Sequence, residues 1–156
     1  MRRGLLILTI VATACSGKIT ITESDIKPDV FYAEGSLRPF SGKCNVVFSN
    51  AGPLKEEFTY KHGLLHGRAT AWHENGQLRR RGYYSKGQIT GKWEFWDEKG
   101  HKTVEAHYNH DELNGAYISY YSNGQIREKG QFTGNRRTGE WLYYNEIGQP
   151  VSAGLR

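Results

Sequence analysis

The sequence predicts an all-β protein in which consecutive β-hairpins form one antiparallel sheet. The chain of 156 residues has 19 Gly, 13% aromatic residues and one Met, but only 37% apolar residues. This composition is typical of short strands joined by tight turns, and the length indicates one domain or one repeat array. The sequence repeats every 24 residues, and turn signals such as Glu-Asn-Gly at 74–76 lie inside the repeat. Consecutive strands with such short connections are expected to be antiparallel neighbours.

An internal repeat divides the chain after a short N-terminal region. The units that we predict are 36–60, 61–84, 85–108, 109–132 and 133–156, and the first of them is degenerate. Two columns of glycine are the structural repeat positions: Gly67, Gly91, Gly115 and Gly139, then Gly76, Gly100, Gly124 and Gly148. A third column holds Gly82, Ala106, Gly130 and Gly154.

The strand pairing predicts one face of the sheet that gathers large rings and small residues. Centring one hairpin between Gln88 and Ile89 places Gly82 opposite Phe95, and side chains alternate between faces along a strand. We call this side the ring face, and rings that cover strand glycines are expected to stabilise it. Its predicted members are Gly82, Tyr84, Trp93, Phe95, Val104, Ala106, Tyr108, Tyr117, Ser119, Ile126, Gly130, Phe132, Trp141 and Tyr143.

The third glycine column is the place where these rings are expected to lie. The pairing above predicts that Tyr143 lies across Gly130. Because Ala106 stands in the same column, one added methyl group is expected to be tolerated at Gly130, whereas Gly130→Val is expected to overpack the face.

The opposite side, which we call the stripe face, carries a candidate binding stripe of one ring per unit: Trp72, Trp96, Tyr120 and Tyr144. Successive rings are two strands, or about 9.5 Å, apart. The alternative is that each ring packs beneath neighbouring Arg and Lys stems. A second surface feature is the column Glu57, Arg81, Glu105 and Lys129, which alternates in sign and predicts a charge ladder between units rather than a phosphate site.

Residues 1–14 are predicted to be a signal peptide, since a basic start precedes an apolar run too short to span a bilayer. Ala12 and Ala14 before Cys15 resemble the lipobox of bacterial lipoproteins, although Ala12 stands where Leu is usual. The resemblance implies a diacylated Cys15 as the mature N-terminus, with residues 15–35 as lipidated terminus and linker. The alternative is an ordinary signal peptide cut after Ala14.

This N-terminal region also predicts location and charge. The resemblance implies a protein lipid-anchored in the bacterial cell envelope, and Ser16 after the cysteine resembles signals directed to the outer membrane. Without Arg2 and Arg3, Lys+Arg falls from 21 to 19 against 16 acidic residues, so the net charge falls from +5 to +3. So small a surplus predicts a solvated surface and no nucleic-acid partner. If Cys15 is lipidated, Cys44 cannot form an intramolecular disulfide, and we predict that it is a small buried residue.

The repeat units resemble a known family. Asn-Gly-x-Leu-x-x-x-Gly-x-Tyr at 75–84 and Gly-x-Trp-x-x-Trp at 91–96 look like the bacterial variant of the MORN repeat (membrane occupation and recognition nexus), and residues 38–43 are similar to the start of many such arrays. The resemblance covers about residues 36–156. It implies an elongated, twisted sheet of hairpins, usually without catalysis and often annotated loosely as an interaction module. Some members of the family carry an antitoxin label.

The residues themselves predict neither an enzyme nor a metal or cofactor site. The histidines are dispersed as polar turn residues: His62, His66, His73, His101, His107 and His110. Carboxylates occur as adjacent pairs, which face opposite ways on a strand and are solvated in a turn. We therefore expect a membrane-anchored lipoprotein whose array serves as a protein-interaction or scaffold module. The alternative is an antitoxin- or immunity-like inhibitor of a partner toxin.

Overall fold

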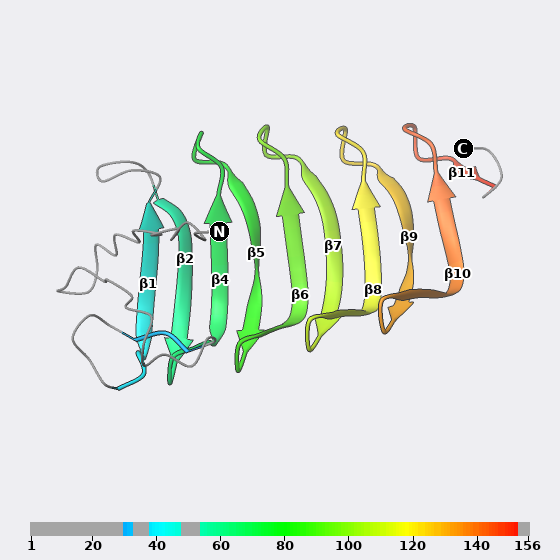
Figure 1. The fold of residues 1–156 in the computed structure, drawn as a ribbon. Coiled ribbons are helices and arrows are strands. Elements are labelled where there is room, and N and C mark those ends of the chain that lie inside the picture. The colour runs from blue at the N-terminus through cyan, green and yellow to red at the C-terminus, as the bar shows by residue number, and fades with distance from the viewer. Residues whose placement is uncertain (1–29, 33–37, 48–53, 153–156) are drawn as a thin grey trace, which may run out of the picture.

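The fold is a single antiparallel β-sheet. The structure, a computed structural model, describes residues 30–32, 38–47 and 54–152, and these residues contain strands and no helix. Figure 1 shows the strands side by side in one row, with hairpin turns along an upper and a lower edge. The strands are β1 (Gly42–Val47), β2 (Leu54–Lys61), β3 (Leu64–Leu65), β4 (Gly67–Trp72), β5 (Leu78–Ser85), β6 (Gln88–Trp96), β7 (Lys102–Asn109), β8 (Glu112–Tyr120), β9 (Ile126–Thr133), β10 (Arg136–Tyr144) and β11 (Pro150–Val151).

The topology follows the order of the chain. The sheet runs β1-β2-β4-β5-β6-β7-β8-β9-β10-β11, with β3 paired to β2, and each paired strand is antiparallel to its neighbour. Strands β6, β8 and β10 begin 24 residues apart, at 88, 112 and 136. The predicted all-β class of consecutive hairpins is therefore confirmed.

The lower turns correct the predicted pairing within a hairpin. Lys86 and Gly87 have φ angles of 51° and 88°, the positive pair that a tight type I′ hairpin turn requires. The turn is thus centred between these two residues, two positions before the predicted centre. Phe95 consequently pairs with Arg80 and not with Gly82. The expected pairing was wrong because the sequence is compatible with two short turns between these strands, one at Lys86-Gly87 and one at Gln88-Ile89, and the structure has the first.

The first glycine column lies at a bulge. Thr90 pairs with Tyr83 and Glu94 with Arg81, so the three residues 91–93 face the single Gly82. Gly91 has a φ of 68° there, a left-handed conformation that side chains disfavour. The second glycine column lies in the upper turns, where φ is also positive: Gly76, Gly100, Gly124 and Gly148. Because the register error is an even number of residues along the hairpin, it leaves the predicted faces unchanged at these strands.

Ile126 is an exception to the predicted faces. Ser119 pairs with Glu128, but the next pair is Tyr120 with Ile126, so Arg127 is an extra residue in β9. Ile126 therefore stands opposite Tyr120 on the stripe face and not on the ring face. A bulge of one residue reverses the side on which the preceding residue lies, and it could not be seen in the alternation of apolar residues.

The core of this single-layer sheet lies on the ring face. Trp93 is 2% exposed and Ala106 is 0% exposed, and the two residues pair across β6 and β7. Trp93 covers Gly82, whose missing side chain leaves room for the indole. Cys44 is 3% exposed and packed by Phe31 and Tyr60, which confirms that it is a small buried residue.

A second cluster of rings repeats this packing over β8–β10. The Trp141 ring lies 5.8 Å from that of Tyr117 and 5.3 Å from that of Phe132, measured between ring centroids. A Cβ on Gly130 would lie 2.8 Å from Cγ of Trp141 and closer still to the fused ring. The ring over Gly130 is therefore Trp141 and not the predicted Tyr143, because the true register is shifted by two residues. The expected tolerance of Gly130→Ala is also wrong, since the ring that the following strand brings to Ala106 is that of Tyr117, whereas at Gly130 it is the larger indole of Trp141.

We predict that Gly130→Ala lowers the free energy of unfolding by about 1–3 kcal/mol, the usual cost of overpacking. Backbone strain contributes nothing to this cost, since Gly130 is not among the residues of positive φ. Urea unfolding, followed by Trp fluorescence, measures it.

The control is a double-mutant cycle. Gly130→Ala combined with Trp141→Tyr rebuilds the pair that Ala106 and Tyr117 form one hairpin earlier. The alanine should then cost less by about 1 kcal/mol or more. An equal cost in both backgrounds would show that the indole does not limit the space at Gly130.

Candidate binding surface

The four residues of the predicted stripe end successive strands on one side of the sheet. They close β4, β6, β8 and β10 and are all half-buried: Trp72, Trp96, Tyr120 and Tyr144. Phe95 lies on the ring face, because it pairs with Val104 as Trp93 pairs with Ala106. Side chains alternate between faces along a strand, so Trp96, the next residue, lies on the stripe face, as do its equivalents. An upper turn follows each of these four strands, as Figure 1 shows.

Two of these rings lie against cations. The guanidinium of Arg81 is 5.3 Å, and the ammonium of Lys102 is 5.4 Å, from the ring centroid of Trp96. Lys129 lies 5.6 Å from the ring of Tyr144. These distances are in the range of cation–π attraction. At Trp96 and Tyr144 the rings thus contact basic side chains, as the alternative interpretation of the stripe expected.

A buried carboxylate organises the charges around Trp96. Glu94 is 9% exposed; its carboxylate accepts a hydrogen bond of 2.7 Å from Nε of Arg81 and another of 2.7 Å from Nζ of Lys102. Burial disfavours its ionisation, but the hydrogen bonds and charges of Arg81 and Lys102 outweigh burial and lower the pKa of Glu94 to about 2. The charged network therefore holds three strands together through one side chain.

This network differs from the predicted charge ladder between units. Arg81 binds Glu94 on the adjacent strand, and Glu105 binds Lys92 at 2.7 Å and Lys102 at 2.6 Å. Adjacent strands are about 4.8 Å apart, whereas equivalent residues of successive units are two strands apart. The alternating column of Arg81 and Glu105 is thus connected through residues of the strand between them.

The stripe face changes character along the sheet. In the column 70, 94, 118 and 142, polar residues of the first two strands give way to Ile118 and Leu142. Both lie beside Lys129, since β9 pairs Lys129 with each of them. We call the following set the apolar patch: Ile118, Tyr120, Ile126, Leu142 and Tyr144. Leu142 is 40% exposed, although it lies within a strand. This patch was not predicted from the sequence, although the two apolar residues in the column beside the stripe indicate it.

Side chains of the upper turns connect neighbouring hairpins. Asn75 donates a 2.6 Å hydrogen bond to the carbonyl of Glu98, and Asn123 donates a 2.7 Å bond to that of Glu146. Between them, Asp97 instead accepts amide hydrogen bonds from its own turn, including one of 2.9 Å from Lys99. Turn-to-turn bonds thus connect alternate pairs of hairpins.

The histidines and carboxylates do not gather into a metal centre in the part of the chain that the structure describes. His73 contacts the carbonyl of Trp96 at 3.0 Å, and His101 contacts Asp97 at 3.2 Å. Both contacts lie at upper turns, in keeping with polar turn roles.

None of the described residues forms a helix of the length and apolarity needed to cross a membrane. The predicted signal peptide and Cys15 lie outside the described residues.

Glu94→Gln should destabilise the protein at pH 7 and become harmless in acid. The pKa of Glu94 is lowered from 4.5 to about 2 in the folded state, so its stabilising effect is present above pH 4.5 and is lost as the pH falls through about 2. Because solvent reaches Arg81 and Lys102, we expect a loss on the order of 1–2 kcal/mol at pH 7. Urea unfolding between pH 7 and pH 2 measures it. Glu140→Gln, the same change at an exposed position of β10, should have little effect, and a pH-independent loss for Glu94→Gln would contradict the electrostatic origin.

Comparison with known proteins identifies the repeat. Three segments, residues 65–86, 89–110 and 113–133, match the MORN repeat variant. No curated protein matches the chain significantly. The matched segments contain all or most of the strands from β4 to β9, while the division of 36–156 into five units stays a prediction. The part of the sheet at residues 65–133 therefore matches three consecutive units of the MORN repeat variant.

Proposed function

We propose that this protein is a non-catalytic protein-interaction or scaffold module of the bacterial cell envelope, held at a membrane by a lipid on Cys15. MORN repeats are in general modules that bind proteins or membranes. The observation that carries the proposal is the apolar patch on the stripe face, where Leu142 is 40% exposed. An apolar surface on a folded domain is typical of a contact site.

The chemistry of the patch specifies the partner. Ile118 and Leu142 flank Lys129, whose ammonium lies against the ring of Tyr144. Within the described residues Lys129 forms no ion pair. A fitting partner is a protein that presents apolar side chains around one carboxylate, because this carboxylate would meet the ammonium as the apolar groups leave water.

Leu142→Asp should weaken partner binding by about tenfold or more, since it places a charge in the middle of an apolar contact. The partner is first isolated by crosslinking from envelope fractions, then titrated against the purified chain. A partner that is toxic when produced alone would indicate the antitoxin- or immunity-like form of the function.

Ser85→Asp is the matched control, because it adds the same charge at an exposed position of β5 away from the patch. Both variants should keep the unfolding midpoint of the wild type, since surface substitutions usually change stability little. Equal binding by wild type and Leu142→Asp would exclude the patch as the contact surface.

Cys15→Ser tests the lipid anchor. The wild type should incorporate a palmitate analogue and fractionate with membranes, because two acyl chains on Cys15 hold a protein stably at a bilayer. The variant should lose the label and be released or remain unprocessed. A wild type that is unlabelled and soluble would support the ordinary signal peptide cut after Ala14.

A further inference from the structure

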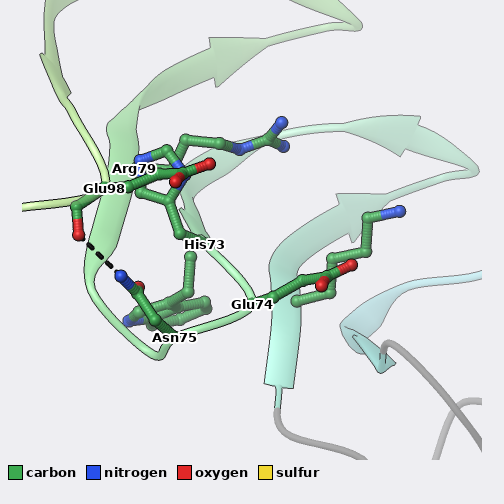
Figure 2. Close-up of a pocket in the computed structure, with 7 residues that line it drawn as sticks. His73, Glu74, Asn75, Arg79 and Glu98 are labelled. Carbon is green, nitrogen blue, oxygen red and sulfur yellow. Dashed lines mark hydrogen bonds between the residues drawn. The ribbon is translucent and has the colours of Figure 1, made fainter.

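A cavity of about 320 Å³ lies at the upper edge of the sheet, apart from the apolar patch. The β4–β5 turn forms much of its wall, and Figure 2 shows His73, Glu74 and Asn75 on this turn with Glu98 of the next upper turn beside them. The residues that line it are Lys55, Trp72, His73, Glu74, Asn75, Arg79 and Glu98.

Hydrogen bonds to backbone fix the shape of this cavity. Asn75 is held at both ends: its Nδ2 donates to the Glu98 carbonyl at 2.6 Å, and its Oδ1 accepts from the Gln77 amide at 3.0 Å. Nε2 of His73 lies 3.0 Å from the Trp96 carbonyl, which can only accept, so this nitrogen carries the proton. The turn is therefore set in place before a ligand arrives, which lowers the entropic cost of binding.

The charges of the lining are balanced. Lys55 and Arg79 contribute two positive charges, and Glu74 and Glu98 contribute two negative charges. Nη2 of Arg79 already donates to Glu56 at 2.6 Å, whereas its buried Nε has no hydrogen-bond partner among the described residues. An anion would meet the two carboxylates and a cation would meet the two basic groups, so the cavity disfavours either.

A neutral ring with many hydroxyl groups can form hydrogen bonds with both the basic and the acidic side chains that line the cavity. We propose that the cavity binds a pyranose unit of a glycan, with the apolar face of the sugar on the indole of Trp72. Its hydroxyl groups donate to the carboxylates of Glu74 and Glu98 and accept from the ammonium of Lys55 and the guanidinium of Arg79, which a group with only donors or only acceptors cannot do. The volume, at the small end of ligand sites, corresponds to one or two sugar units.

The site is particular to the β4–β5 turn. At the equivalent Trp96 the ring lies against Arg81 and Lys102, but the residues 24 positions earlier are Glu57 and Leu78. Trp72 therefore lacks the two equivalent cations that occupy the neighbourhood of Trp96. The inference goes beyond the proposed protein contact, which uses β8–β10, and either can fail without the other.

The experiment is a titration of the full chain followed by the indole ¹H–¹⁵N signals of its 4 Trp residues. Cellotriose, maltotriose and tri-N-acetylchitotriose are the probes. Adenosine, an aromatic ligand, and tetramethylammonium, a cationic ligand, are titrated for comparison. We expect a saturable shift of the Trp72 signal with at least one oligosaccharide, while the Trp96 signal stays in place.

Two variants locate the site. Glu98→Ala should weaken the oligosaccharide by about tenfold or more through loss of a charged hydrogen bond. Glu146→Ala is the matched control, because its carbonyl accepts the same turn-to-turn bond from Asn123, and it should bind as the wild type does. Trp72→Ala should abolish binding while the signals of Trp93 and Trp141 show an intact ring face.

The proposal is overturned if no oligosaccharide shifts the Trp72 signal, or if Glu98→Ala and Glu146→Ala bind equally. A larger response of Trp72 to adenosine or tetramethylammonium than to every sugar would also overturn it, in favour of an aromatic or cationic ligand.

Discussion

The close approach of an indole to a strand glycine is the constraint on which this sheet depends. A single layer has no second layer to bury its apolar side, so its own rings must lie flat on its own backbone. Trp93 does so over Gly82 and reaches 2% exposure. Only a residue without a side chain can lie beneath an indole in this way, which fixes Gly82 and Gly130 more strictly than any turn does. The bulge at Gly91 is part of the same arrangement, since it brings Trp93 opposite Gly82.

The contacts indicate that the array is built from pairs of hairpins and not from single ones. Trp covers Gly at 82 and at 130, but the intervening hairpin pairs Ala106 with a Tyr. The same alternation appears at the upper edge, where Asn75 and Asn123, 48 residues apart, reach the next turn. Lys99 occupies the equivalent position in the intervening unit. It does not form the same bond, because a Lys side chain is longer than that of Asn and ends in an ammonium instead of an amide. These two contacts thus recur after 48 residues, twice the period of the glycine columns.

The sequence determined the fold class and the faces but not the register, and the reason is physical. Glycine columns and ring alternation are local signals that survive a shift of two residues, so the ring face and the buried Cys44 could be predicted. The position of the turn depends on which residues tolerate positive φ, and Lys86 does so without being Gly, Asn or Asp. The side of Ile126 depends on a one-residue bulge. Of the candidate surface, the stripe could be located, but the cations at Trp96 and the apolar patch depend on cross-strand neighbours that the 24-residue alignment does not show.

The two ends of the stripe face differ in what they leave available to a partner. Around Trp96 the charges are used internally, since Glu94 lies between Arg81 and Lys102 and is almost buried. An approaching partner would have to compete with those short hydrogen bonds, and breaking a buried pair is costly. Toward β10 the corresponding column holds Leu142, which has no such bond to lose. Recognition is thus expected where the repeat departs from its own electrostatic pattern, while the middle of the sheet holds the array together.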